Sequence, residues 1–333
     1  MGDSTGSTRT PIVTVLTPVY NGEKYLAECV ESVLAQTYRN FEYVIVDNCS
    51  TDKTLEIARE YAHKDARIWV VTNERHVGVI ENHNIAFRHV SAESKYCKVV
   101  SADDWIYPQC LRLLVEVGER NPTAGIIGSY QQRSNRIMWK GVSRNAELVS
   151  GRQACRMTFL DDLTIFGPPT STLYRSDLVR ANTPFYSTSL PHADICAFYD
   201  YLDKSDFGFV HEVLSVERIH SEQTSTKPND LYADLIADIS NVLKYGRAYL
   251  EEDERAAVLH RYMKRYYSRL GGAVLKLKGK NFWEFHRSRM ADLGIPISWV
   301  KVARAAVSEM LQEMKNPRIG FRKFGQALKR TIH

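Results

Sequence analysis

The sequence lacks the glycine-rich loops that hold phosphates in two large classes of nucleotide-binding enzymes. No G-x-G-x-x-G segment follows the first strand-like run, and G-x-x-x-x-G-K-[S/T] does not occur in the 333 residues. The first pattern serves dinucleotide oxidoreductases and the second serves P-loop nucleotidases. Their absence argues against both classes.

Long apolar runs and paired cysteines are missing as well. No run approaches 18 consecutive apolar residues, so we expect no transmembrane helix. The six cysteines are spread along the chain without a C-x-x-C pair, which predicts free thiols in a cytoplasmic protein. The opening MGDSTGSTRTP has no apolar signal core, and we expect a disordered tail over residues 1–10.

Charge is distributed unevenly. Residues 261–333 hold 17 Lys and Arg against 4 Asp and Glu, a net charge of +13, whereas residues 1–260 hold 27 against 35, a net charge of −8. Aromatic residues alternate with the basic ones in RYMKRYYSRL and KLKGKNFWEFHRSR. This pattern suits a helix lying on an anionic membrane, or a helical cap with a solvated basic face. No nucleic-acid-binding module accompanies it, so we expect no nucleic acid partner.

Residues 11–130 alternate short apolar runs with amphipathic helical patterns. We expect strands at 12–16, 41–46, 68–71, 96–100 and 125–128, the first stopping at Pro18. Helical spacing of apolar residues follows the first run, and Ser50 or Thr51 is placed to cap a second helix. The alternation predicts an α/β fold with a mostly parallel sheet and flanking helices. Ligands of such sheets bind beyond the carboxyl ends of the strands.

The order becomes mixed after residue 130. We expect a strand ending the segment 167–175, a helix in 191–202, and two short strands at 207–210 and 213–216. From residue 231 the pattern is helical, with breaks at 271–272, 294–296 and 316–317. These patterns divide the chain into a domain over 11–228, with halves at about 11–130 and 131–228, and a helical basic region over 229–333.

Two carboxylates follow the predicted fourth strand. Asp103 and Asp104 lie in SADDW, where hard oxygen ligands can hold Mg²⁺ or Mn²⁺ together with diphosphate oxygens. The alternative is that Asp103 caps the next helix and Asp104 is solvated.

Polar and aromatic residues follow the first two strands. Asp47 and Asn48 can accept from a base or a ribose hydroxyl, or can instead form the turn that starts the next helix. Tyr20 can stack on a base or serve as a packing aromatic.

Three more positions are candidates farther along. Asp194 opens a helix, where it can act as a general base or as an ordinary first-turn acid. Arg218 and His220 can contact a diphosphate. The histidines at 76, 83 and 211 show no metal-binding spacing, and we interpret them as ordinary surface or interface residues.

These segments resemble the family 2 glycosyltransferases, which are inverting nucleotide-sugar enzymes with the Rossmann-like GT-A fold. TPVYNGEKYL is similar to the P-x-Y-N segment of the family, VIVDNCSTDKT to its V-D-x-x-S-T-D-x-T segment, and SADDW to its acidic metal motif. FGPPTSTLYRSDLV and the R-I-H-x-x-Q-T-S segment at 218–225 resemble later parts of bacterial members. The similarity covers about residues 11–225, and the first two motifs at this spacing are highly specific.

The resemblance implies a role for each matching residue. Nucleotide contacts fall to Pro18 and Tyr20 at the base, Asp47 and Asn48 at uracil or ribose, and Asp103 at ribose. Asp104 would bind Mg²⁺ or Mn²⁺, and Asp194 would be the general base. Ala193 replaces the acid that often precedes this base, and Ser101 stands where many members have the first acid of D-x-D-D.

The implied reaction is transfer of a sugar from a nucleoside diphosphate, UDP first among them, to a hydroxyl. The acceptor would be a glycan or lipid-linked glycan in cell-surface polysaccharide synthesis, met by a cytoplasmic enzyme at the inner face of the membrane. Two alternatives stay open. Ser101 and Ala193 favour an inactive nucleotide-sugar-binding protein of the same fold, and a nucleotidyltransferase is the other.

Overall fold

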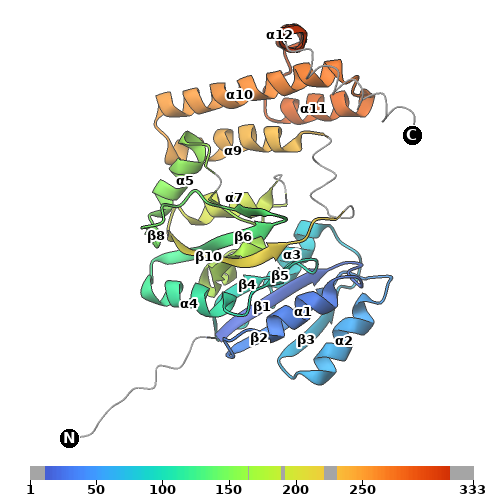
Figure 1. Ribbon diagram of the computed structural model, residues 1–333, viewed down its shortest axis with the longest axis vertical. Coiled ribbons are helices and arrows are strands. Elements are labelled where there is room, and N and C mark those ends of the chain that lie inside the picture. The colour runs from blue at the N-terminus through green and yellow to red at the C-terminus, as the bar shows by residue number, and fades with distance from the viewer. Residues whose placement is uncertain (1–11, 164, 189–191, 221–230, 316–333) are drawn as a thin grey trace, which may run out of the picture. The chain divides into compact units, whose positions relative to one another are not determined.

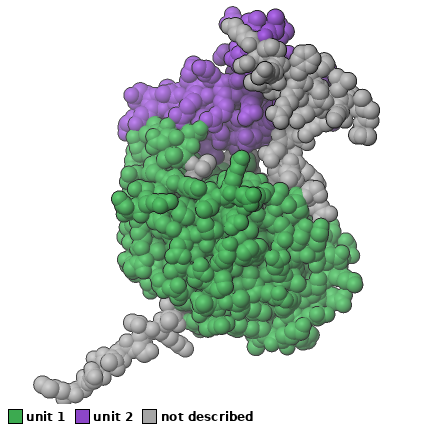
Figure 2. Space-filling view, in the orientation of Figure 1, with its two compact units in different colours: residues 1–220 green, residues 221–333 purple. Residues whose placement is uncertain are grey.

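The computed structural model describes residues 12–163, 165–188, 192–220 and 231–315, with the side chains of Glu313 and Lys315 left aside. The chain divides into two compact units, residues 1–220 and 221–333 (Figure 2). The expected tail over residues 1–10 and the expected boundary at 228 both lie outside the described residues.

The first unit is built on one ten-stranded sheet with helices around it (Figure 1). Its strands are β1 (Ile12–Val19), β2 (Phe41–Asp47), β3 (Ile68–Thr72), β4 (Ser94–Val99), β5 (Trp105–Ile106), β6 (Ala124–Arg133), β7 (Arg136–Met138), β8 (Leu148–Val149), β9 (Thr172–Arg175) and β10 (Asp206–Glu217). Its helices are α1 (Leu26–Leu34), α2 (Thr54–Lys64), α3 (Val79–Phe87), α4 (Cys110–Arg120), α5 (Gly151–Leu160), α6 (Ser176–Arg180) and α7 (Ala193–Tyr201), with a 3₁₀ turn η1 (Pro169–Ser171).

The predicted parallel sheet is confirmed in the first half of this unit. The strand order is β3-β2-β1-β4-β9-β6-β10-β5, and the first four strands pair in parallel. The apolar face expected on α1 is also found, since Leu26, Cys29, Val30 and Val33 are buried. They join residues of α4 and of the sheet in one core cluster. Full burial stabilises each large apolar side chain by about 1.5–3 kcal/mol, which fixes these helices on the sheet.

The prediction that the first strand stops at the proline is wrong, because β1 continues to Val19. Leu16 is the last residue of β1 whose carbonyl accepts from the β4 side, where it receives the N–H of Val100. Residues of a parallel strand bond alternately to the two neighbours, so the nitrogen of Pro18 faces the side where pairing has ended. A missing N–H costs nothing there.

The second half of the sheet is mixed. β9 lies antiparallel between β4 and β6, and the two short strands expected at 207–216 are a single strand, β10. Its register against β6 shifts on either side of Val213. This irregularity explains why the apolar residues of β10 fall into two runs, 207–210 and 213–216. The short β5 pairs antiparallel with the end of β10.

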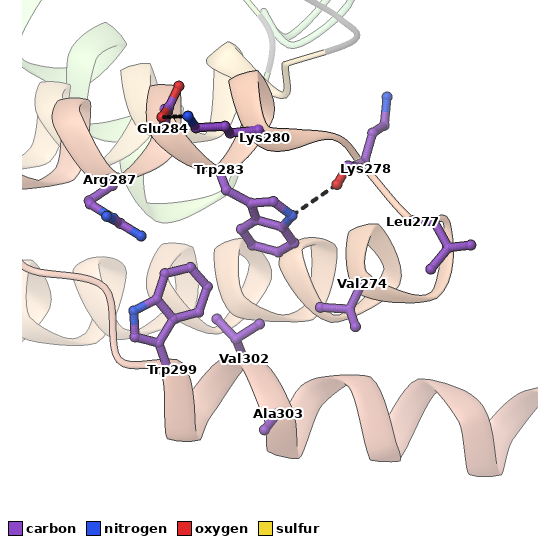
Figure 3. A pocket seen from close by; sticks show the side chains of 10 residues that line it. All are labelled: Val274, Leu277, Lys278, Lys280, Trp283, Glu284, Arg287, Trp299, Val302 and Ala303. Carbon is purple, nitrogen blue, oxygen red and sulfur yellow. Dashed lines mark hydrogen bonds and ion pairs between the residues drawn. The ribbon is translucent and has the colours of Figure 1, made fainter.

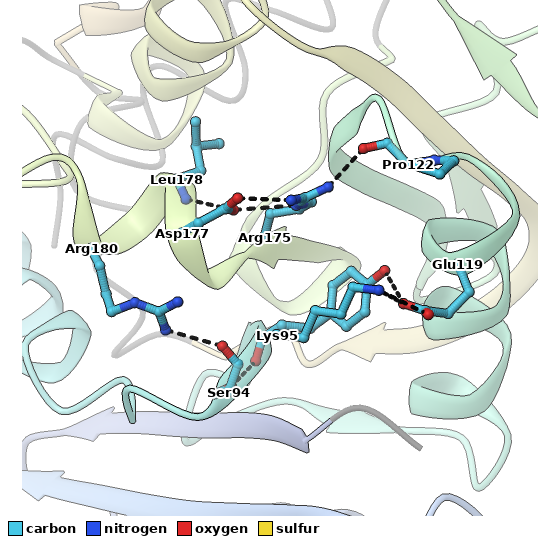
Figure 4. Close-up of polar contacts among 9 residues, drawn as sticks. Ser94, Lys95, Glu119, Pro122, Arg175, Asp177, Leu178 and Arg180 are labelled. Atoms are coloured by element: carbon cyan, nitrogen blue, oxygen red, sulfur yellow. Dashed lines mark hydrogen bonds and ion pairs between the residues drawn. The ribbon is translucent and has the colours of Figure 1, made fainter. Parts of the chain in front are cut away.

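Charged side chains hold the antiparallel strand β9 in place (Figure 4). Arg175, the last residue of β9, binds Asp177 at 2.7 Å and donates to the carbonyl of Pro122 at 2.7 Å. Glu119 of α4 receives both the hydroxyl of Tyr96 and the Lys95 ammonium of β4. Strands β4 and β9 are thereby fixed at one end, and their other ends approach the site described below.

The second unit is helical in the described residues, as expected. It contains α9 (Ala233–Tyr249), α10 (Glu252–Leu275), α11 (Lys280–Asp292) and α12 (Trp299–Lys315). A capping box between Glu251 and Glu254 starts α10. No helix in the described part of the chain is long and apolar enough to cross a membrane.

The break expected at 271–272 is wrong, because α10 runs through both glycines. A Cβ on Gly271 would lie 2.6 Å from the backbone of Ala305, whereas a Cβ on Gly272 would meet nothing within 4 Å. Gly271 therefore serves the close approach of α10 and α12, not a turn. The break expected at 294–296 is confirmed between α11 and α12, and the one at 316–317 lies outside the described residues. The prediction of free cysteines is confirmed for all six.

Candidate active site

The predicted site segments lie beyond the carboxyl ends of three neighbouring strands. Val19 at the end of β1 is in register with Asp47 at the end of β2. β4 pairs with the other side of β1, and the acidic pair at 103–104 follows its end. The chain reverses its strand order at β1, with β2 on one side and β4 on the other. Open α/β sheets bind ligands at such a point.

The loops after β1 and β2 are cross-linked by hydrogen bonds. Thr51 N–H donates to Asn21 Oδ1 at 2.8 Å, and Asp52 Oδ2 accepts the N–H of Glu23 at 3.1 Å. The expected capping of α2 by Ser50 or Thr51 is wrong. Helix α2 begins at Thr54, whose N–H is accepted by Asp52 Oδ1 at 3.0 Å. Ser50 and Thr51 therefore join two loops instead of capping the helix, and Asp52 accepts an N–H both from the other loop and from the start of α2.

An exposed aromatic ring and a buried carboxylate lie at the ends of β1 and β2. The ring of Tyr20 is 47% exposed and lies 4.3 Å from the ring of His76. Pro18 and Asp47 are buried on the adjacent strands, and the Asp47 carboxylate accepts the Ser50 N–H at 3.3 Å. An exposed ring beside a buried carboxylate suits the stacking and hydrogen bonding of a base.

The side-chain amide of Asn48 is hydrogen-bonded to other residues of the chain. Its amide nitrogen donates to the carbonyl of Val77 at 2.8 Å, while its amide oxygen accepts from Val77 N–H and from Asn73. Asn73 in turn donates to Asn82 at 2.8 Å. These bonds hold the loop that carries His76, so the structure gives Asn48 a positioning role. Its direct contact with a nucleotide stays a prediction.

Asp104 is a buried carboxylate with few compensating groups. Its side chain accepts from the Thr170 hydroxyl at 2.7 Å and from the Arg218 backbone N–H at 3.2 Å. Burial, and then the charge of Asp103, raises the pKa of Asp104 to about 7. A cation beside this carboxylate would relieve both effects.

Asp103 contacts both residues that are predicted to bind the diphosphate. Nε2 of His220 lies 3.1 Å from its Oδ2, and Nε of Arg218 donates to its backbone carbonyl at 3.2 Å. The Arg218 guanidinium also forms an ion pair with Glu28 and lies 4.7 Å from the ring centroid of Tyr25. The structure thus brings together four predicted residues, Asp103, Asp104, Arg218 and His220, from segments 114–117 positions apart.

A buried lysine supports the turn behind Asp104. The ammonium of Lys98, on β4, donates to the carbonyls of Pro169, Thr170 and Thr172. Burial lowers the pKa of Lys98 to about 8. Three carbonyls of one tight turn meet on this ammonium, and the turn places the Thr170 hydroxyl against Asp104.

Asp194 lies in the first turn of α7, as predicted, and is half-buried. None of the described residues donates a hydrogen bond to its carboxylate. Its charge acts on His83, whose pKa is lowered by burial and raised again in part by Val79 and Asp194. The ring of His83 lies 6.0 Å from that of Tyr186.

The acidic pair fits a divalent cation only with help from a ligand. Within the described ranges no group of three or more His, Cys, Asp or Glu side chains is arranged to hold a metal. Asp104 nevertheless supplies hard oxygen atoms at a buried and under-compensated position. Mg²⁺ binds in this manner, through one or two carboxylates completed by water and phosphate. The residues fit such an ion when a diphosphate completes the shell.

Sequence reasoning missed several contributors. The missing metal spacing of His76 and His83 predicts ordinary surface or interface residues, yet the ring of His76 lies tilted against that of Tyr20 and His83 lies near Asp194. Lys98, Thr170 and Glu28 carried no signal of their own, because each acts through a contact between distant segments.

Comparison with known proteins points to one family. Residues 14–182 match the model of "Glycosyl transferase family 2". A protein of Haemophilus influenzae named as an uncharacterized glycosyltransferase is 25% identical over 66% of this chain and 69% of its own length. The poly(ribitol-phosphate) beta-N-acetylglucosaminyltransferase TarS of Staphylococcus aureus is 26% identical over 79% of this chain but 46% of its own length.

Solved structures agree on the fold. Residues 1–349 of S. aureus TarS in complex with UDP-GlcNAc align with a TM-score of 0.59 at 23% identity, over 80% of this chain and 76% of that one. A mannosyltransferase from Pyrobaculum calidifontis in complex with GDP-Man and Mn²⁺ aligns with a TM-score of 0.54 at 17% identity, over 96% and 86% of the two chains. The expected GT-A fold with added C-terminal helices is confirmed.

Proposed function

Since the chain belongs to the family 2 glycosyl transferases, we propose that it is an inverting enzyme that moves a sugar from a nucleoside diphosphate to a hydroxyl. The observation that carries this proposal is Asp104, a buried carboxylate beside Asp103 at the strand edge where such sheets bind ligands. UDP is the proposed nucleotide, because the relative TarS was solved with a UDP-sugar.

The donor would be held between two groups of residues. Tyr20 would stack on the base, and Asp47 would accept its N–H or a ribose hydroxyl. Asp103 would contact the ribose. Asn48 would act mainly by fixing the loop around His76, because its amide is already bonded within the chain.

Asp104 would hold Mg²⁺ or Mn²⁺, which when bound neutralises negative charge on the departing diphosphate. Arg218 would add positive charge to the same group, and His220, which lies beside Asp103, would contact the diphosphate. Arg218 is ion-paired with Glu28 in the structure, so a diphosphate would compete with that carboxylate for the guanidinium. The carboxylates of Asp103 and Asp104 repel each other at a buried position. A bound cation would relieve this repulsion, which would increase its affinity for the site.

Asp194 would be the general base. The acceptor oxygen would attack the anomeric carbon as the bond from that carbon to the diphosphate oxygen breaks, and the acceptor proton would pass to Asp194. One displacement inverts the anomeric centre. General-base help contributes about 10²–10⁴-fold, so orientation of the two substrates must supply much of the remainder.

The proposed acceptor is a glycan or a lipid-linked glycan of a cell-surface polysaccharide. Its name assigns TarS a ribitol-phosphate polymer acceptor, which is consistent with a polymeric substrate here. A lipid-linked acceptor would place the enzyme in the cytoplasm at the inner face of the membrane. The net charge of +13 over residues 261–333 supports that location.

The direct test is thermal unfolding with UDP, GDP, TDP or CDP, each with and without Mn²⁺. A ligand at 100 times its dissociation constant stabilises by about 2.7 kcal/mol, or several degrees at about 2–4 °C per kcal/mol. We expect a Mn²⁺-dependent shift with UDP that Asp104→Ala abolishes. Glu60→Ala, an exposed acid on α2, is the matched control. No shift with any nucleotide in the folded wild type would refute the donor site.

A binding protein without transferase activity is the second candidate. It is favoured by Ser101, which stands where many family members have an acid and whose N–H donates to Thr170. It is also favoured by the buried Ala193, which replaces the acid that often precedes the general base. Incubation with UDP-sugars and cell-surface glycans, followed by analysis of released UDP and of the glycan mass, separates the two. Nucleotide binding without any turnover would favour this candidate.

A further inference from the structure

Large apolar side chains that face solvent gather in the second unit. Among the described residues 15 such side chains are exposed, and 9 of them lie between residues 274 and 314. They are Val274, Leu275, Leu277, Trp299, Val300, Val307, Met310, Leu311 and Met314, which we call the apolar face. Soluble proteins rarely leave so large a group of apolar side chains exposed unless it binds something.

The part of this face on α12 forms a stripe. Val300, Val307, Leu311 and Met314 are spaced by seven, four and three residues, which places them on one side of a helix. They are 49–69% exposed. The buried Val302 points elsewhere and holds the helix in the unit. The stripe is therefore a second apolar side of α12, separate from the side that packs.

A pocket of about 690 Å³ lies beside the start of α12, on the side of that helix that carries Val302 and not on the stripe itself (Figure 3). The rings of Trp283 and Trp299 lie 5.5 Å apart in its wall, and the indole N–H of Trp283 donates to the carbonyl of Lys278. Ala303 lines the pocket from α12. Leu277 projects at the turn after α10, with its side chain 89% exposed and a backbone φ of 52°. An apolar residue held in a left-handed conformation and in full contact with water is costly in an isolated unit.

Positive charge surrounds the pocket and the start of the stripe. Residues 276–304 contain seven Lys and Arg against two acids, and both acids are within 4 Å of one of these cations. Lys278, Lys280 and Arg287 line the pocket, and Arg304 follows Ala303 on α12. A second copy of this chain would bring two such sets of cations together. These cations would repel each other, whereas a binding partner with negative charge would attract them.

We propose that the apolar face docks on a bilayer that contains anionic lipid. Leu277 and Trp299 would enter the interface between headgroups and acyl chains, while the surrounding cations would contact lipid phosphates. α12 would lie in the plane of the bilayer with its stripe inward, as amphipathic interfacial helices do. The proposal deepens the proposed function, because it names the surface by which the enzyme would reach a lipid-linked acceptor.

The test is cosedimentation of the full chain with two kinds of vesicle, phosphatidylcholine alone and phosphatidylcholine mixed with phosphatidylglycerol. We expect binding to the mixed vesicles only, weakened by salt. Leu277→Asp should reduce the partition coefficient about tenfold or more, from the loss of one buried apolar side chain. Arg304→Glu should reduce it more than about fivefold, the effect expected from one lost cation.

Matched variants in the first unit control for general changes in polarity and charge. Ile137 is 43% exposed on β7, and Lys64 is exposed on α2. Ile137→Asp and Lys64→Glu should partition as the wild type does. Lipids with brominated acyl chains should quench tryptophan fluorescence in the wild type, and Trp299→Phe should remove much of that quenching.

Three results would overturn the proposal. They are no binding of the folded wild type to mixed vesicles, equal binding by Leu277→Asp, and a dimer in solution that Leu277→Asp dissociates. The last result would show that a second copy covers the face. Thermal shifts with UDP and Mn²⁺ on the same variants keep the two questions apart. Vesicle binding without nucleotide binding would refute the donor site alone, and the reverse would refute the docking surface alone.

Discussion

The hydroxyl of Thr170 donates to the carboxylate of Asp104 across 2.7 Å, and the two residues are 66 positions apart in the chain. This bond links the turn before β9 to the acidic segment after β4. It is one of only two hydrogen bonds from described residues that lower the pKa of Asp104, the other coming from the backbone of Arg218. The ionised form of Asp104, which a metal requires, therefore depends on a turn that has no charge of its own.

Thr170→Val should weaken binding of UDP with Mn²⁺. The variant keeps the side-chain shape but leaves the Asp104 carboxylate without one donor, which raises the pKa of Asp104 further. A lost hydrogen bond to a buried acceptor costs about 1–3 kcal/mol, so the dissociation constant should rise by roughly 5- to 100-fold in calorimetric titration. Thr37→Val removes a hydroxyl that donates to the carbonyl of Pro108 at 3.1 Å and serves as the control. Equal affinities for both variants would contradict this role.

Lys98→Met should destabilise the turn at 169–172 that carries Thr170. The variant keeps the length of the side chain and removes the ammonium that holds the carbonyls of Pro169, Thr170 and Thr172. We expect a loss of about 1–3 kcal/mol in the free energy of unfolding, measured in urea, because buried carbonyls lose their partner. Affinity for UDP with Mn²⁺ should fall as well.

Lys95→Met separates this effect from a general loss of charge on β4. Lys95 is exposed and pairs with Glu119, so its variant should change stability by less than about 1 kcal/mol. It should leave nucleotide affinity unchanged. If Lys98→Met lowers stability and leaves nucleotide affinity intact, the lysine is structural only.

Asp194→Asn should keep donor binding and lose transfer. The substitution preserves size and removes the group proposed to take the acceptor proton, so the rate should fall by about 10²–10⁴-fold. Asp200→Asn, an exposed acid on the same helix, should retain the wild-type rate. The measurement is release of UDP in the presence of acceptor, with UDP affinity measured in parallel. A full rate for Asp194→Asn would refute its assignment as base.

The sequence was sufficient for the parallel half of the fold because its evidence there is local. Each strand of β1 to β4 is a short apolar run, and α1, which follows the first of them, has its apolar residues in one helical period. The acidic segments could be placed at one sheet edge for the same reason. Parallel strands share the direction of their carboxyl ends, so knowing the strands fixed the location of Asp47 and Asp104.

What the sequence could not supply depends on contacts between distant segments. Pro18 reads as a strand end, yet it is tolerated inside β1 because pairing with β4 stops at Leu16. Lys98 lies within the strand expected at 96–100 without any role indicated by the sequence, and only the position of η1 shows that carbonyls surround it. Gly271 reads as a break, and only the approach of α12 shows that it is a packing position.

Acid should weaken the second unit through His286. This side chain is buried in α11, accepts or donates to the Tyr266 hydroxyl at 3.1 Å, and has a pKa that burial lowers from 6.5 to about 4. The unfolded chain therefore binds a proton between these pH values that the folded chain does not. Neutral His286 therefore leaves the free energy of unfolding undiminished above about pH 6.5. As the pH falls toward 4, protonation of the unfolded chain lowers the free energy of unfolding by about 3 kcal/mol in all.

His286→Gln should remove that dependence. Glutamine retains a partner for Tyr266 and does not titrate, so its free energy of unfolding should change less between pH 6.5 and 4.5 than that of the wild type. Urea unfolding followed by the fluorescence of Trp283 reports on the same helix. His63→Gln, at an exposed position of α2, should keep the wild-type slope. Parallel slopes for the wild type and His286→Gln would contradict the assignment.

The two adjacent glycines of α10 give opposite expectations for the same substitution. Gly272→Ala meets open space and gains helix propensity, so it should stabilise by about 0.5–1 kcal/mol. Gly271→Ala gains the same propensity but places its Cβ 2.6–2.7 Å from the backbone of Ala305 and Ala306. Backbone cannot move aside as a side chain does, so α12 must shift, at a cost of about 1–3 kcal/mol. Urea unfolding of both variants measures the difference directly. If the two alanines stabilise equally, α10 and α12 do not approach as closely as the structure has them, and the apolar stripe on α12 loses the packing that orients it.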